Sequence, residues 1–176
     1  MILNSDIMLH HPLWERVDNE LCNKDGIGLF NRLIDVYILA CAIGIKEDKV
    51  IDEIEEPLAS PKSIGRNTYM SMTNTDLKET LDFMLQNALI NSNTIKFNEE
   101  ERIKLAFDPD YTVSKFSAAA FLTGFANYGI KCIMEQVDSN SPIVVIDGLY
   151  QYFNSLAESK YEEILRTITL EELSKM

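Results

Sequence analysis

The stretch FLTGFANYGIKCI, residues 121–133, decides the fold, because it combines a strongly apolar composition with two glycines and an asparagine. On a helix over residues 113–137, polar side chains recur every four residues in one narrow stripe, and apolar side chains cover the rest. A helix of this kind lies mostly buried. Gly124 and Gly129 each cost roughly 1 kcal/mol relative to alanine in a helix interior. We therefore expect them to mark the close approach of a second helix, with Asn127 beside that contact.

The second central helix is predicted at residues 27–45, IGLFNRLIDVYILACAIGI, which are apolar on nearly every face. Two further helices are expected on the surface of the bundle. Residues 75–91 place their leucines on one face, which is typical of an amphipathic helix. Residues 98–107 begin with Asn98 followed by Glu101, the spacing of a capping box.

Residues 142–157 are compatible with two structures. A run of β-branched residues followed by Asp147-Gly148 and aromatic residues is typical of a tight hairpin. In contrast, the Ser141-Pro142 start and the helical spacing of the later apolar residues favour a helix. We favour the helix, and the hairpin remains the alternative.

These elements predict a single all-α domain over residues 1–176, a compact bundle of five to seven helices around the two buried central helices. A hydrophobic content of 46% is enough to bury a sizeable core. Seven glycines and five prolines are few for a fold with many tight turns. Residues 1–25 are expected to be an irregular N-terminal segment, and residues 57–75 a loop.

The charge and cysteine content restrict the class of protein. The formal net charge is −12 and no basic tail stands out, which argues against bulk electrostatic binding of nucleic acid. The three cysteines are dispersed, with no CxxC spacing. The N-terminus does not have the pattern of a signal peptide, and the apolar stretch 27–45 is broken by Asn31, Arg32 and Asp35. We expect a reduced, cytoplasmic protein with no membrane span.

No catalytic or metal-binding motif is found in the sequence. His10 and His11 are adjacent, so they point in different directions and cannot form the i, i+4 pair of a zinc helix. The only Gly-x-Gly, at residues 25–28, lacks the strand and the third glycine of a dinucleotide loop. Nuclease, hydrolase and phosphate-loop motifs are not found either. We therefore predict a protein that is not an enzyme and has no cofactor and no metal.

The candidate binding residues lie mainly in the stretch 57–75, which contains no acidic residue. Lys62, Arg66 and Tyr69 in this stretch are predicted to contact phosphates or an acidic partner, and the alternative is an ordinary exposed loop. Asn127 is the fourth candidate. Its alternative role is that of a solvated or capping side chain.

Two motifs of the central helices carry a family resemblance. The segment at 30–45 contributes Phe30, Asp35, Val36, Tyr37, Ala40, Ala42 and Gly44, and FANYGI at 125–130 contributes Ala126, Asn127 and Gly129. The pattern resembles the Dnd system-associated protein 4 family, small proteins encoded beside bacterial DNA phosphorothioation genes. The resemblance extends over residues 25–157. This chain departs from the family at Thr123-Gly124, where the family has an acidic pair, and at Phe125, where the family has tyrosine.

The resemblance implies a setting among bacterial defence genes and no established activity. We therefore predict a non-enzymatic accessory or adaptor protein of a phage-defence system associated with DNA phosphorothioation, which binds protein partners and for which homo-oligomerisation stays open. One alternative is an acidic inhibitor or nucleic-acid mimic that blocks a DNA-binding protein. The other is a small DNA-binding regulator that uses the 57–75 loop. An exposed apolar patch favours the adaptor, rows of exposed carboxylates the mimic, and a positive patch the regulator.

Overall fold

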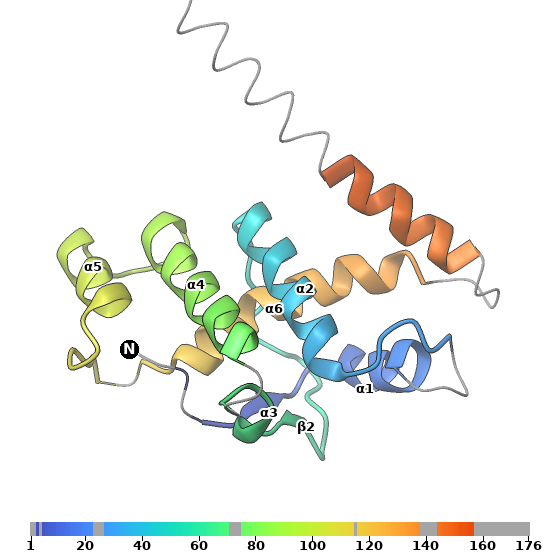
Figure 1. Cartoon of the computed structure of the whole chain (residues 1–176), viewed down its shortest axis with the longest axis horizontal. Coiled ribbons are helices and arrows are strands. Elements are labelled where there is room, and N and C mark those ends of the chain that lie inside the picture. The colour runs from blue at the N-terminus through green and yellow to red at the C-terminus, as the bar shows by residue number, and fades with distance from the viewer. Residues whose placement is uncertain are drawn as a thin grey trace, which may run out of the picture. The chain divides into compact units, whose positions relative to one another are not determined.

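The computed structural model describes residues 3, 5–22, 27–70, 75–114, 116–137 and 144–156. Most of these residues are helical (Figure 1), which confirms the all-α prediction. The chain forms two compact units, residues 1–132 and 133–176, and the prediction of a single domain stays a prediction. The labelled elements are β1 (Ile7–Leu9), α1 (Leu13–Val17), the π-helical turn η1 (Asp18–Cys22), α2 (Leu33–Glu47), β2 (Lys62–Ile64), α3 (Arg66–Met70), α4 (Thr75–Asn91), α5 (Glu99–Phe107) and α6 (Ala118–Glu135).

Helices α2 and α6 cross in close contact at two glycines. A Cβ atom added at Gly129 of α6 would lie 1.9 Å from the carbonyl oxygen of Ala40 in α2. A Cβ atom added at Gly44 of α2 would lie 2.2 Å from the carbonyl oxygen of Phe125 in α6. Backbone therefore packs on backbone at both points, as the sequence predicts for Gly129.

Helix α2 begins at Leu33 rather than at residue 27. Gly28 has a φ of 61° and Arg32 is extended, so the chain enters the helix only after both residues. The Arg32 guanidinium then binds the Asp35 carboxylate at 2.6 Å in the first turn, where a negative charge suits the helix dipole.

Helix α6 begins at Ala118 rather than at residue 113. The N–H of Phe116 donates to the carbonyl of Val113 at 3.1 Å, which closes a turn ahead of the helix. The Ser117 Oγ then accepts from the N–H of Ala120 at 3.3 Å, as an N-cap side chain does.

Helices α4 and α5 agree with the sequence prediction. Helix α4 covers residues 75–91 as predicted. At the start of α5, the Asn98 Oδ1 accepts from the N–H of Glu101 at 3.0 Å, and the Glu101 Oε2 accepts from the N–H of Asn98 at 3.1 Å. The capping box is thereby confirmed.

Two regions predicted to lack regular structure contain it. The segment 1–25 holds β1, α1 and η1, and the segment 57–75 holds β2 and α3, so neither is simply irregular or a loop. Strands β1 and β2 pair antiparallel, with Met8 opposite Ser63. Each strand is only three residues long and its partner lies far away in the sequence. A local pattern does not detect such a ladder.

Residues 144–156, in the second unit, form a helix. This confirms the helix and excludes a turn at Asp147-Gly148. Val145 and Leu149, four residues apart, are both buried. The Gln151 amide donates to the Asp147 carboxylate at 3.0 Å across one turn of this helix.

Candidate functional site

Acidic residues from the N-terminal segment lie beside both predicted cations of the segment 57–75, and one of them forms an ion pair with Lys62. The Lys62 ammonium donates to the Asp18 carboxylate at 2.8 Å, and this hydrogen bond raises the pKa of the ammonium. The backbone N–H of Arg66 donates to the Asp6 carboxylate at 2.7 Å, although the Arg66 residue is exposed. The stretch 57–75 itself contains no acidic residue, but the fold brings the carboxylates of Asp18 and Asp6 to it from the N-terminal segment.

Tyr69 is not available for binding. It belongs to α3 and is fully buried, and its hydroxyl donates to the carbonyl of Ser5. Burial raises the pKa of the phenol, and Asp6 raises it further. Tyr69 is therefore a core residue that fixes the N-terminal segment, and the prediction that it forms part of an exposed binding surface is wrong.

Asn127 is a buried link between three segments. Only 3% of it is exposed, so it is not a solvated side chain. Its Oδ1 accepts from the Trp14 indole at 2.9 Å, and its Nδ2 donates to the Ile51 carbonyl at 3.0 Å. These bonds join α6 to α1 and to the segment after α2. Because Trp14 lies 113 residues away, no local sequence signal could have revealed this role.

Several other motif residues of the resemblance have structural roles, whereas Ala42 is exposed. Gly44 and Gly129 form the crossing of α2 and α6, and Ala126 is fully buried. Phe30 lies half-buried ahead of α2, and Asp35 forms the ion pair at its start.

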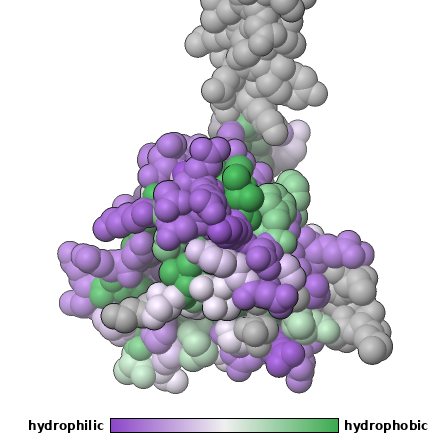
Figure 2. Space-filling view, turned by 90° about the vertical axis from the view of Figure 1, so that its left-hand side faces the viewer, coloured by the Kyte–Doolittle hydropathy of each residue, from purple (hydrophilic) through white to green (hydrophobic). Residues whose placement is uncertain are grey.

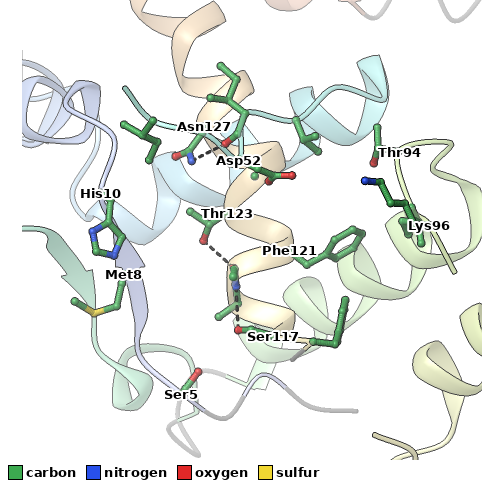
Figure 3. Close-up of a pocket in the computed structure, with 18 of the residues that line it drawn as sticks. Ser5, Met8, His10, Asp52, Thr94, Lys96, Ser117, Phe121, Thr123 and Asn127 are labelled. Atoms are coloured by element: carbon green, nitrogen blue, oxygen red, sulfur yellow. Dashed lines mark hydrogen bonds between the residues drawn. The ribbon is translucent and has the colours of Figure 1, made fainter. Parts of the chain in front are cut away.

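A cleft of about 630 Å³ lies beside the N-terminal half of α6 (Figure 3). It is bounded by β1 with its neighbours, by the segment 50–54 after α2, by the 94–97 loop between α4 and α5, and by α6 itself. The lining residues are Ser5, Asp6, Met8, His10, Val50, Ile51, Asp52, Ile54, Thr94, Ile95, Lys96, Phe97, Phe116, Ser117, Ala119, Ala120, Phe121, Thr123, Gly124 and Asn127.

Gly124 opens the floor of this cleft and is not a helix–helix contact, contrary to the sequence prediction. A Cβ atom there would meet the Asp52 carboxylate oxygen at 2.3 Å, so the carboxylate lies directly against the backbone of α6. The neighbouring Thr123 is buried, and its hydroxyl donates to the Ala119 carbonyl at 2.7 Å and lies 3.2 Å from the Tyr37 hydroxyl. Of the two positions that are acidic in the family that the chain resembles, one therefore holds an internally bonded hydroxyl and the other a glycine that Asp52 packs against.

One side of the cleft is an aromatic wall. The rings of Phe97 and Phe116 lie 5.6 Å apart at 70°, and those of Phe116 and Phe121 lie 5.6 Å apart at 46°. Phe121 continues the series to the buried Phe125 at 5.2 Å. These spacings are those of favourable aromatic pairs, which hold the wall in one shape.

Two side chains of opposite charge, Asp52 and Lys96, also line the cleft. In Figure 3 the Lys96 ammonium and the Asp52 carboxylate point toward one another across the cleft, with Phe121 beneath them in this view. Partial desolvation raises the pKa of Asp52, and the neighbouring Glu53 raises it further. The charged form of this carboxyl is thus less well solvated than that of an ordinary surface aspartate.

A second surface is the outer side of the α4–α5 pair. The large apolar side chains of Phe83, Ile90, Ile103 and Phe107 are 65%, 36%, 47% and 62% exposed. We call these four residues the α4–α5 apolar face. Figure 2 views this side of the molecule and shows green apolar atoms among purple hydrophilic ones.

Side-chain bonds to backbone carbonyls align the two helices of this face. The Gln86 amide donates to the Ala106 carbonyl at 3.3 Å, and the Arg102 guanidinium donates to the Leu89 carbonyl at 2.7 Å. The helices are therefore antiparallel neighbours, and the two pairs of apolar residues recur at helical spacings of seven and four. Phe83 of α4 and Phe107 of α5 therefore lie at the same end of the helix pair.

Within the described ranges, no group of three or more His, Cys, Asp or Glu side chains is placed to hold a metal ion. Among the helices that the structure describes, none has the length and apolarity needed to cross a membrane.

Comparison with protein-family models, with curated proteins and with solved structures finds no match to this chain.

Proposed function

We propose that this protein is a non-enzymatic accessory or adaptor protein of a bacterial phage-defence system associated with DNA phosphorothioation, and that it acts through protein–protein contacts. The single observation that carries the adaptor function is the α4–α5 apolar face. Phe83 and Phe107 are each more than 60% exposed, although aromatic side chains contribute most to stability when they are buried. The setting among defence genes is supported by the resemblance of the helices at 30–45 and 125–130.

The border of the face indicates the chemistry of the partner. The exposed carboxylates of Glu79 and Glu99 lie one turn away from Phe83 and Ile103 on the same helices, whereas the neighbouring Glu100 is paired with Lys104. A partner with an apolar centre and a cationic rim would complement this arrangement. A second copy of this chain, joined face to face, would bring acidic rims together in a protein of net charge −12. We therefore favour a different protein over a homodimer at this face.

The two alternatives receive less support. A DNA-binding regulator needs a positive patch, and Lys62 of the expected patch is paired with Asp18. A nucleic-acid mimic needs rows of exposed carboxylates, whereas the centre of the α4–α5 face is apolar.

The test uses the proteins encoded by the genes that flank this one. Each is purified, and its binding to the protein is measured by surface plasmon resonance. The variant Phe83→Gln/Phe107→Gln should weaken binding to the true partner at least tenfold, because exposed aromatic side chains are typical interface anchors. The control variant Val144→Gln/Tyr150→Gln removes side chains of similar exposure, 55% and 65%, from the other unit and should leave binding unchanged.

Two results would overturn the proposal. Flanking genes without any modification or restriction function would remove the phosphorothioation setting. Equal binding by the wild type and the Phe83→Gln/Phe107→Gln variant, with both proteins folded by circular dichroism, would remove the face as the adaptor surface.

A further inference from the structure

The cleft beside α6 holds two charges that the fold does not neutralise. Among the described residues, Asp52 accepts no hydrogen bond and forms no ion pair, and Lys96 likewise has no partner. Several other lysines are engaged: Lys62 with Asp18, Lys78 with Asp82 and Lys104 with Glu100. Among the described residues, Lys96 is therefore an unpaired cation that lines a cleft, in a protein whose formal net charge is −12.

The unpaired carboxylate is the more informative of the two charges. It lies against the backbone of Gly124 and loses part of its hydration there, as the direction of its pKa shift shows. A partly desolvated charge without a partner costs free energy, which a ligand of opposite charge recovers on binding. The Asp52 carboxylate thus favours an ammonium group, and the Lys96 ammonium facing it favours a carboxylate (Figure 3).

The other residues that line the cleft indicate the chemistry of the ligand's side chain. The rings of Phe97, Phe116 and Phe121 form one wall of the cleft, and aromatic rings pack favourably on other aromatic rings. Ala120 of α6, which has a small side chain, also lines the cleft. A volume of about 630 Å³ is within the usual range for a small-molecule site.

From this arrangement we propose that the cleft binds a free amino acid with an aromatic side chain. Its ammonium group lies at Asp52, its carboxylate lies at Lys96, and its ring packs on the wall formed by Phe97, Phe116 and Phe121. This site is independent of the adaptor function at the α4–α5 face, and either can fail without the other.

The primary test is isothermal titration calorimetry of the full chain with L-phenylalanine at pH 7. A ligand of this size in a half-open cleft is expected to bind with a Kd of about 0.1–1 mM. Two analogues separate a free amino acid from the end of a peptide chain. N-acetyl-L-phenylalanine keeps only the carboxylate and mimics a C-terminus, whereas L-phenylalaninamide keeps only the ammonium and mimics an N-terminus. Each should bind at least fivefold more weakly than L-phenylalanine.

Matched variants locate the site. Asp52→Asn and Lys96→Met should each weaken binding of L-phenylalanine at least fivefold. The controls Glu79→Gln and Lys131→Met remove the same charges from exposed residues that do not line the cleft, and they should bind as the wild type does. Circular dichroism establishes that all four variants are folded.

Three results would overturn the proposal. The first is the absence of any binding heat at 10 mM (about ten times the weakest Kd expected) L-phenylalanine. The second is equal or tighter binding of either analogue, which would assign the cleft to a chain terminus. The third is an equal effect of the cleft variants and their controls, which would leave only non-specific charge attraction.

Discussion

The crossing of α2 and α6 provides the sharpest test of the fold, through the substitution Gly129→Ala. The added Cβ atom would lie 1.9 Å from the oxygen, 2.6 Å from the carbon and 2.8 Å from the Cα atom of the Ala40 peptide unit. These are backbone atoms of a buried helix, so no side-chain rotation can relieve the overlap. To restore ordinary van der Waals contact, the two helices must separate locally by roughly 1.5 Å.

The cost follows from that separation. A gap of about 0.5–1 Å already loses a quarter to a half of the dispersion attraction between facing atoms. Overpacking of a core usually costs about 1–3 kcal/mol, and the obstruction by backbone places Gly129→Ala at or above the upper end of this range. Alanine recovers about 1 kcal/mol through its higher helix propensity. We therefore expect a net loss of about 2–3 kcal/mol in the free energy of unfolding. This corresponds to a fall of about 5–10 °C in Tm.

The assay is urea and thermal unfolding, followed by circular dichroism and by the fluorescence of Trp14, the single tryptophan and a fully buried one. Gly65→Ala is the matched control, because no atom lies within 4 Å of its added Cβ. Gly124→Ala meets only the Asp52 side chain at close range, which can turn away, so it should be close to neutral. A Tm for Gly129→Ala within a degree of the wild type would refute the close backbone contact.

Three other substitutions or probes test single sites. Asn127→Leu leaves the indole N–H of Trp14 buried without an acceptor, and urea denaturation should show a loss of about 2–4 kcal/mol. Although partial desolvation raises the pKa of Asp48, hydrogen bonds from the loop after α4 outweigh it and lower that pKa. The stabilisation by Asp48 is then present above the unfolded carboxyl pKa of about 3.9 and is lost as pH falls through the lower folded value. The stability deficit of Asp48→Asn measured at pH 7 should therefore shrink as the pH falls below about 3.9. Burial raises the pKa of Cys41 to about 12, and burial with nearby carboxylates raises the pKa of Cys22 to about 11. A thiol reagent is tested at about pH 8, near the usual thiol pKa. It should leave Cys41 unmodified until urea unfolds the chain, and it should modify Cys22 only slowly.

The longer helices and the close helix contact at Gly129 could be predicted from the sequence, because their causes are local, whereas the short helices α1 and α3 could not. The apolar periodicity at residues 75–91 and the capping box of Asn98 with Glu101 act within one or a few turns, and both are confirmed. Gly129, an unfavourable residue inside a strongly apolar helix, indicated a close neighbour without identifying it. The helix at 144–156 followed from the same period of 3.6 residues, which outweighed the hairpin composition.

The candidate sites were decided by tertiary structure alone, because their partners lie far apart in the chain. Lys62 is neutralised by Asp18 of η1, which lies 44 residues earlier in the chain. The role of Asn127 depends on Trp14, which lies 113 residues earlier. Asp52 and Lys96 line the same cleft, although they belong to two separate segments that contain no recognisable motif. A helix is specified by interactions between residues three and four apart, whereas the environment of a charge depends on which remote segment folds against it.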